Sequence, residues 1–194
     1  MAEVTPIAAA SVILLRDGPL EVLMIRRHEN RSFAPDVWAF PGGAVEDIDD
    51  ERGEGIVLNT MRFAAARELV EETGISLGTP LDLERLVWTS HWITPEGLPK
   101  RFDTYFFLAC VGRDTVTALQ ASEAVDSIWI SPADAVQRHL AGSFPLFFPT
   151  LKNLEAIVGF RSSTELIESR RKSDIPTTRP VIVIENGEKK IVLP

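Results

Sequence analysis

Three glutamates, Glu68, Glu71 and Glu72, recur at spacings of three and four residues within a run of strong helix formers. In an α-helix such spacings return to one face, so the three carboxylates share a stripe about 100° wide. Like charges this close repel one another unless a cation lies between them, and carboxylate oxygens are hard ligands that suit Mg²⁺ or Mn²⁺. The spacing therefore predicts a divalent-metal site, with a solvated acidic helix face as the alternative.

The helix that carries these acids is expected over residues 60–73. Gly74 follows at the position where a left-handed residue commonly ends a helix. Arg67 stands one turn before Glu71, so it can pair with that carboxylate and hold it in place.

The opposite side of this helix is expected to face the core. Its apolar residues recur at i, i+3 and i+7, and they are Phe63, Ala66 and Val70. Ala64 and Ala65 are small and leave the acidic face uncluttered. The helix is thus predicted to have an inside and an acidic working face.

The acids belong to a longer motif. Residues 67–75 match every fixed position in the second half of the Nudix signature, Gly-x5-Glu-x7-Arg-Glu-U-x-Glu-Glu-x-Gly-U with U aliphatic, and residues 40–46 resemble its Pro-Gly-Gly-x-x-Glu opening. The chain therefore resembles the Nudix hydrolase family. The resemblance implies an α/β fold, namely an α/β/α sandwich around a mixed β-sheet, and an enzyme that cleaves a diphosphate linkage in a nucleotide-derived substrate. Its metal residues, which would hold Mg²⁺ or Mn²⁺ on the substrate's phosphates, would be Gly43, Glu68, Glu71 and Glu72.

The spacing inside this box departs from the signature. Counting from Gly43, the position of the first box glutamate is occupied by Asp49. The signature has seven residues between this position and the arginine, whereas here the longer stretch of residues 50–66 separates Asp49 from Arg67. We interpret residues 50–59 as an inserted excursion of the loop before the helix.

A rival register keeps the standard spacing. It starts at Gly53 and places Asn59 where the glutamate belongs, and it leaves Pro41-Gly42-Gly43 outside the box. The register that starts at Gly43 is therefore preferred.

Nudix enzymes often place a further acid outside the box, as a metal ligand or as the base for the attacking water. A base is needed because water attacks a phosphorus atom shielded by anionic oxygens. Glu123, six residues before Trp129, resembles that acid, and a plain exposed loop acid is the alternative. Asp126 is the second choice, and Glu72 could also serve. The catalytic set implied by the resemblance is Arg67, Glu68, Glu71, Glu72 and Glu123.

Basic and aromatic residues on both sides of the box are candidates for substrate contacts. Arginine forks match phosphate geometry, and aromatic rings beside basic groups suit a nucleobase. The candidates are Arg26, Arg27, Arg31, Trp92 and Arg101, with His28 beside the first group. The alternatives are solvated surface positions for two of the four residues Arg26, Arg27, His28 and Arg31, and a buried core position for Trp92.

The substrate is less constrained by the sequence than the reaction. Over about residues 8–140 the chain resembles the acyl-CoA diphosphatase branch of the family. The resemblance lies in four features: the Trp-x-Phe-Pro-Gly-Gly run, the acidic insertion, the His-Trp-Ile-Thr-Pro run and the Arg-Phe-Asp-Thr run. This resemblance implies CoA or acyl-CoA as the substrate. Nucleoside diphosphate sugars, dinucleotides and oxidised nucleotides stay open, as does a Nudix-fold ligand sensor without hydrolysis. A sensor usually lacks box acids, and this chain retains them.

The composition limits the class of protein. A chain of 194 residues with 45% apolar content suits one domain with an appendage. Its net charge of -8, without a long run of one sign, gives no footprint for nucleic acid. One cysteine, Cys110, fits a reducing compartment, and no segment approaches the roughly 20 apolar residues of a membrane span. We expect a cytoplasmic protein that acts on a small nucleoside diphosphate-type molecule, with neither nucleic acid nor membrane as a partner.

The elements that must position these residues follow from apolar runs and turn residues. Strands are expected at residues 9–15, 21–26, 83–93, 104–111 and 127–130, further helices at 131–140 and 150–160, and a terminal hairpin at 181–184 and 191–193. We expect a Nudix domain over residues 1–160 and a helical and hairpin extension over 161–194. Because two short strands alone are marginal in water, the extension should cover the cleft or dock in a homodimer, with continuation of the chain's own sheet as the alternative.

Overall fold

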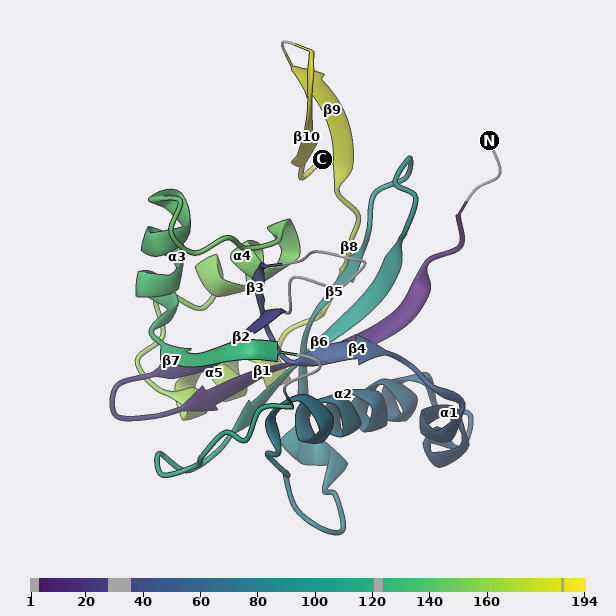
Figure 1. Cartoon of the computed structure of the whole chain (residues 1–194). Helices are drawn as coiled ribbons and strands as arrows, with labels where there is room; N and C mark the ends of the chain where they lie inside the picture. Colours follow the sequence, from purple (N-terminus) through teal and green to yellow (C-terminus); the bar gives the residue numbers. More distant parts are fainter. Residues whose placement is uncertain (1–3, 28–35, 121–123, 186) are drawn as a thin grey trace.

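A mixed β-sheet forms the centre of the molecule (Figure 1). The computed structural model describes residues 4–27, 36–120, 124–185 and 187–194. The strands are β1 (Ile7–Arg16), β2 (Glu21–Arg27), β3 (Trp38–Ala39), β4 (Gly42–Ala44), β5 (Val87–Ile93), β6 (Phe102–Cys110), β7 (Ala124–Ile130) and β8 (Thr177–Thr178). Their order is β3-β2-β1-β6-β5-β8, with β4 paired to β1 and β7 to β2. The pairs β1–β6 and β5–β8 are parallel and the other pairs antiparallel, so the predicted mixed sheet is confirmed.

Helices cover both faces of this sheet (Figure 1). The helices are α1 (Asp47–Gly53), α2 (Val57–Thr73), α3 (Pro132–Leu140), α4 (Phe148–Glu155) and α5 (Ser163–Arg171), with a short 3₁₀ turn, η1 (Leu83–Arg85), before β5. Helix α2 packs on one face, and α3, α4 and α5 contribute buried residues to the core on the other. This arrangement confirms the predicted α/β/α sandwich.

Strand β1 shows why two separate cores form. Val12 and Leu14 are buried in the core that contains α2, whereas Ile13 and Leu15 are buried in the core that contains α3–α5. Successive side chains of a strand point to opposite faces, so a strand covered on both sides is apolar throughout. The continuous apolar run of β1 is the sequence signature of this position.

The predicted core-facing side of α2 is wrong. The buried apolar residues of this helix are Met61, Ala64, Ala65 and Leu69. Val70 is 44% exposed, and Phe63 lies 4.2 Å beneath the guanidinium of Arg52 on α1. Only Ala66 touches the core, at its edge. The small alanines face the sheet because they let the helix backbone approach it closely. The prediction followed the larger apolar residues Phe63 and Val70 and therefore chose the wrong face.

The expected loop at residues 50–59 is also wrong, because most of it is helical. Helix α1 occupies its first part, Glu54 and Gly55 then turn through the left-handed region, and α2 begins at Val57. A Cβ atom at Gly53 would collide with Thr60, so glycine there lets the end of α1 pack against the start of α2. The insertion is therefore a short helix fixed to the acidic helix.

Other boundaries shift by a few residues. The strand expected at residues 83–93 begins only at Val87, after η1, and the helix expected at 150–160 is α4, which ends at Glu155. The hairpin of residues 9–15 and 21–26 is confirmed as β1–β2. Helix α2 ends at Gly74, whose φ of 69° confirms the left-handed cap. No helix in the described part of the chain is long and apolar enough to cross a membrane.

The C-terminal extension contains a helix and a hairpin, as predicted. Leu166 of α5 is fully buried in the same core as α3 and α4, so this helix packs with the body of the chain. Strands β9 (Val181–Glu185) and β10 (Glu188–Val192) pair with each other in a sheet of their own. The division into residues 1–160 and 161–194 stays a prediction.

Candidate active site

A cavity of about 580 Å³ lies beside α2 and β4. The residues predicted to do chemistry that line it are Arg27, Gly43, Glu68, Glu71, Glu72 and Trp92. Its volume lies in the usual range for small-molecule sites. The fold therefore brings the acidic stripe, the glycine pair and one arginine to a single hollow.

The two glycines of β4 permit very close approaches. A Cβ atom at Gly42 would collide with Ser11 on the neighbouring β1, and one at Gly43 would collide with the Glu68 carboxylate. The Gly42 N–H donates to Glu72 Oε2 at 2.8 Å, and the Glu72 side chain is almost completely buried. The glycine pair thus fixes β4 against β1 on one side and against the acids of α2 on the other.

Arg67 connects the acids of α2 to the end of β4 and to α1. Its Nη1 donates to Glu68 Oε1 and Glu71 Oε2, both at 2.9 Å. Its Nη2 donates to the carbonyl of Ala44 at 2.8 Å and to Asp49 Oδ2 at 2.9 Å. The predicted pairing of Arg67 with Glu71 is present, and it is one part of a larger network.

Asp49 occupies the place that the preferred register assigns to it. Its side chain is only 1% exposed, and it accepts from Arg67 Nε and Nη2 and from the Glu46 N–H. Gly53, where the rival register starts, packs instead against Thr60. The structure therefore favours the register that starts at Gly43.

Arg67 keeps its charge in this setting. Burial opposes the charged form, but hydrogen bonds to the carboxylates of Asp49 and Glu68 outweigh burial and raise the pKa of Arg67 above its ordinary value. A guanidinium is already protonated at neutral pH. A fixed positive charge therefore stands among the acids and offsets part of their mutual repulsion.

The acids line one cavity, but they do not form a ready cation cage. Among residues 4–27, 36–120, 124–185 and 187–194, no three His, Cys, Asp or Glu side chains are placed to hold a metal ion. Glu68 and Glu71 are turned to Arg67, and Glu72 is turned to the Gly42 N–H. Carboxylates on one helix face are still the oxygen donors that Mg²⁺ and Mn²⁺ prefer. The residues fit the predicted metal by ligand type, without preformed geometry.

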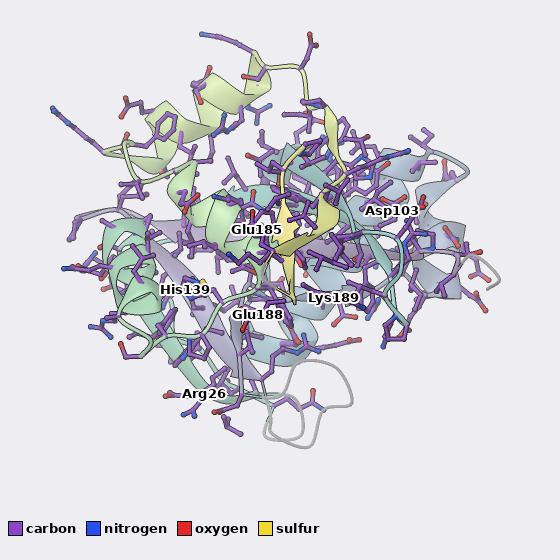
Figure 2. The ribbon with its side chains drawn as sticks, turned by 90° about the horizontal axis from the view of Figure 1, so that it is seen from above. Arg26, Asp103, His139, Glu185, Glu188 and Lys189 are labelled. Carbon is purple, nitrogen blue, oxygen red and sulfur yellow. The ribbon has the colours of Figure 1, made fainter. Side chains whose placement is uncertain are left out.

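The candidate arginines separate into two kinds. Arg27 lines the cavity, and its buried Nε has no hydrogen-bond partner within the described chain. Arg26 points elsewhere and pairs with Asp36 at 2.5 Å (Figure 2). Arg101 is buried, and it donates from Nε to the carbonyl of Thr94 at 3.0 Å and from Nη1 to that of Val4 at 2.9 Å. Of the three candidate arginines that the structure describes, Arg27 alone lines the cavity.

Trp92 combines the two roles that the sequence left open. It is 7% exposed and belongs to the core of α3–α5, yet one side of it lines the cavity. Its ring meets that of Phe148 edge-on with centroids 6.1 Å apart. The indole N–H is buried and has no acceptor among the residues described, so it is the ring of Trp92 that is placed to meet a ligand.

Three candidates cannot be placed in this way. Glu123, Arg31 and His28 lie outside the described residues. Asp126, the second choice for the additional acid, is exposed on β7, and its carboxylate accepts from the Ser127 N–H at 2.8 Å. It is not among the residues that line the cavity.

The cavity also has walls that the sequence analysis did not identify. They come from the β5–β6 loop, the start of α4 and the C-terminal segment, and they include Leu98, Phe147, Phe148, Pro180 and Ile191. The pair of phenylalanines before Pro149 was the available signal, because two large rings at a helix start are unusual on a surface. Nothing in the local sequence linked Ile191 to the box.

Residues 5–148 match the NUDIX domain. A solved structure of a NUDIX hydrolase from Alicyclobacillus acidocaldarius superposes with a TM-score of 0.79 at 24% identity, covering 86% of this chain and 97% of that one. This likeness supports the fold.

Curated relatives match at similar identity over different lengths. Putative nudix hydrolase 7 of Caenorhabditis elegans is 29% identical over 178 residues, 76% of this chain and 59% of the relative. The m7GpppN-mRNA hydrolase NUDT17 of Danio rerio is 30% identical over 61% of this chain and 38% of its own length. The acyl-coenzyme A diphosphatase NUDT19 of Homo sapiens is 30% identical over 44% of this chain and 24% of its own length. The chain thus spans less than two thirds of each of these relatives.

Proposed function

Because this chain belongs to the NUDIX domain family, we propose that it hydrolyses a diphosphate linkage in a nucleotide-derived substrate with the help of Mg²⁺ or Mn²⁺. The observation that carries this proposal is the convergence of Glu68, Glu71 and Glu72 with the Gly42-Gly43 pair on one cavity. A lone acidic helix face would have no such hollow beside it.

The metal-binding residues are proposed to be Glu68, Glu71, Glu72 and the backbone of Gly43. A bound divalent cation supplies charge neutralisation on the phosphate oxygens and a lower pKa for a bound water. Glu68 and Glu72 are held in place by Arg67 and by the Gly42 N–H, respectively. These contacts keep both carboxylates beside the cavity, and the carboxylates would turn toward the cation when it binds.

Two residues of the chain are proposed to meet the substrate directly. Arg27 lines the cavity, so its guanidinium would donate to a phosphate oxygen. Trp92 lines the same cavity, and its ring would contact an apolar part of the substrate. Arg67 acts through Glu68 and Glu71 as a positioning residue.

The base for the attacking water is proposed to be Glu123, with Glu72 as the rival. Glu72 lies in the cavity, but its carboxylate is already engaged by the Gly42 N–H. A carboxylate that serves as a metal ligand is a poorer base, so a separate acid suits the reaction better. Loss of the acidic limb of the pH–rate profile in Glu123→Gln, with metal affinity retained, would assign the base to Glu123.

The proposed substrate is CoA or an acyl-CoA. The sequence runs shared with the acyl-CoA diphosphatase branch and the 30% identity to one such enzyme support this choice. A capped or bridged dinucleotide is the second candidate, because the similarity to an m7GpppN-mRNA hydrolase extends over more of this chain. The retained box acids favour an enzyme over a ligand sensor.

The test is a turnover screen with Mg²⁺ and Mn²⁺ of CoA, octanoyl-CoA, a nucleoside diphosphate sugar, a dinucleoside polyphosphate and a cap dinucleotide. Glu71→Gln and Glu72→Gln should lower kcat about a thousandfold or more, since each keeps the side-chain volume and removes a ligand charge. Glu51→Gln is the matched control, because Glu51 is exposed on α1 and does not line the cavity. Binding without turnover would indicate a sensor, and near-normal activity in Glu71→Gln or Glu72→Gln would refute the site.

A further inference from the structure

The C-terminal hairpin has an unusual position. Strands β9 and β10 pair only with each other among the strands described. Figure 1 shows them projecting above the sheet, on the side away from α2, and Figure 2 shows them over the middle of the molecule from above. An isolated two-stranded hairpin is marginally stable at best in water, so contacts at its base must hold it.

The base of the hairpin belongs to the cavity wall. Ile191 is paired with Ile182 near the open end of the hairpin, and both Ile191 and Pro180 line the cavity. Ile184 lies on the same face, since side chains two apart on a strand point the same way, but it is nearer the turn and 73% exposed. The face is therefore in the cavity at one end and in solvent at the other.

Strand β8 fixes where the hairpin emerges. Thr177 pairs with His91, and Thr178 with Trp92, in a parallel arrangement. The Thr177 hydroxyl lies 2.9 Å from His91 Nδ1, and His91 Nε2 lies 2.5 Å from Asp103 Oδ1. His91 is buried, so the chain of three groups is held firmly between β5, β6 and β8. It ties down the backbone a few residues before Pro180.

Apolar residues make up part of the cavity wall, beside polar ones such as Thr94, Lys100 and Thr150. The apolar residues concerned are Pro95, Leu98, Phe147, Phe148, Pro180 and Ile191. The carboxylates of the cavity come instead from α2 and the segment before α1. One cavity thus offers acids to one part of a ligand and an apolar surface to another.

We propose that the β9–β10 hairpin is a specificity element, in which Pro180 and Ile191 select diphosphates that carry an apolar group, and that the Thr177–His91–Asp103 chain positions it. This inference rests on the proposed function, because the diphosphate must lie at the acids for the apolar group to reach the hairpin. The hairpin then acts on substrate choice, whereas the acids act on the reaction itself.

Ile191 gives the direct test, with CoA and octanoyl-CoA as a pair that differs by the octanoyl thioester on the thiol. The parent chain should prefer octanoyl-CoA in kcat/KM, and Ile191→Asp should reduce that preference about tenfold, the effect of two or so methylene groups losing an apolar contact. Ile191→Leu should keep the preference. Ile184→Asp is the matched control, since it places the same charge on the same face outside the cavity.

Thr177 tests the positioning chain. Thr177→Val keeps the β-branched shape and removes the hydroxyl, so we expect KM for octanoyl-CoA to rise severalfold with kcat nearly unchanged. Thr177→Ser should restore the parent KM, which a general loss of stability would not explain.

The outcomes separate the two proposals. Absence of turnover by the parent chain on every member of the screen would remove the proposed function and this inference with it. A second outcome would overturn the hairpin inference alone. In it, the parent chain turns over substrate and Glu71→Gln does not, but the parent has equal kcat/KM for CoA and octanoyl-CoA, or Ile191→Asp leaves the preference unchanged.

Discussion

The contact between Asp49 and Arg67 makes a sharp prediction about stability. Asn replaces Asp49 without changing its volume, but it removes the charge that faces the guanidinium at 2.9–3.3 Å and sets an amide N–H₂ beside it. Removing one partner of a buried ion pair costs about 3–5 kcal/mol. Because Arg67 keeps Glu68 and Glu71, we take the lower end, about 3 kcal/mol, for Asp49→Asn.

Thermal unfolding measures this effect directly. For a chain of this size, about 3 kcal/mol corresponds to a Tm lower by roughly 6–12 °C. Asp50→Asn is the matched control, because Asp50 is the exposed neighbour on the same helix, and its Tm should stay within about 2 °C of the parent value.

Asn59 supplies the comparison between the two registers. If the box instead started at Gly53, Asn59 would occupy the supporting position, and Asn59→Ala would destabilise the chain more than Asp49→Asn does. We expect the reverse order. A Tm for Asp49→Asn equal to that of Asp50→Asn would refute both the register and the estimate drawn from the buried pair.

Three further predictions concern the metal, the glycine pair and the C-terminal extension. Millimolar Mg²⁺ or Mn²⁺ should raise the Tm relative to EDTA, because a cation that binds only the folded acids stabilises them, and an indifferent Tm would contradict the shared-stripe argument. Gly43→Ala should lower turnover strongly by displacing the Glu68 carboxylate, whereas Gly112→Ala, at a glycine with open space around it, should not; equal activities would remove Gly43 from the site. Deleting residues 177–194 should lower activity, and light scattering of the parent and truncated chains tests the predicted homodimer. An unchanged number of subunits, together with unchanged activity and Tm, would make the segment a dispensable tail.

The acidic stripe could be predicted from the sequence because helix geometry alone fixes it. Three- and four-residue spacings bring Glu68, Glu71 and Glu72 together whatever surrounds the helix. The inner face of the same helix could not be predicted as easily, because Ala64 and Ala65 are ambiguous. Alanine is a helix former on any face, and only the nearness of the sheet decides that these two are buried.

Residues that depend on distant contacts were the hardest to identify. Arg101 stands in a basic and aromatic cluster, which resembles a substrate site, but its guanidinium binds two backbone carbonyls and joins the N-terminal segment to β5. Ile191 is the opposite case, because it lines the cavity although an isoleucine in a terminal hairpin carries no local sign of function. Its place in the cavity wall follows from the β5–β8 pairing, which joins parts of the chain far apart in sequence.

The insertion inside the box explains how a signature can be interrupted without losing its site. Asp49 must meet Arg67, and this requirement concerns distance in space, not the number of residues between them. Helix α1 starts just before Asp49, which meets Arg67, and ends at Gly53, which packs against Thr60, so both ends of α1 are fixed to α2. The added residues then lie outside the cavity, where they change neither the acids nor the glycine pair. An insertion at this point is tolerated because α1 replaces a short loop with a rigid connection that delivers the same carboxylate to the same guanidinium.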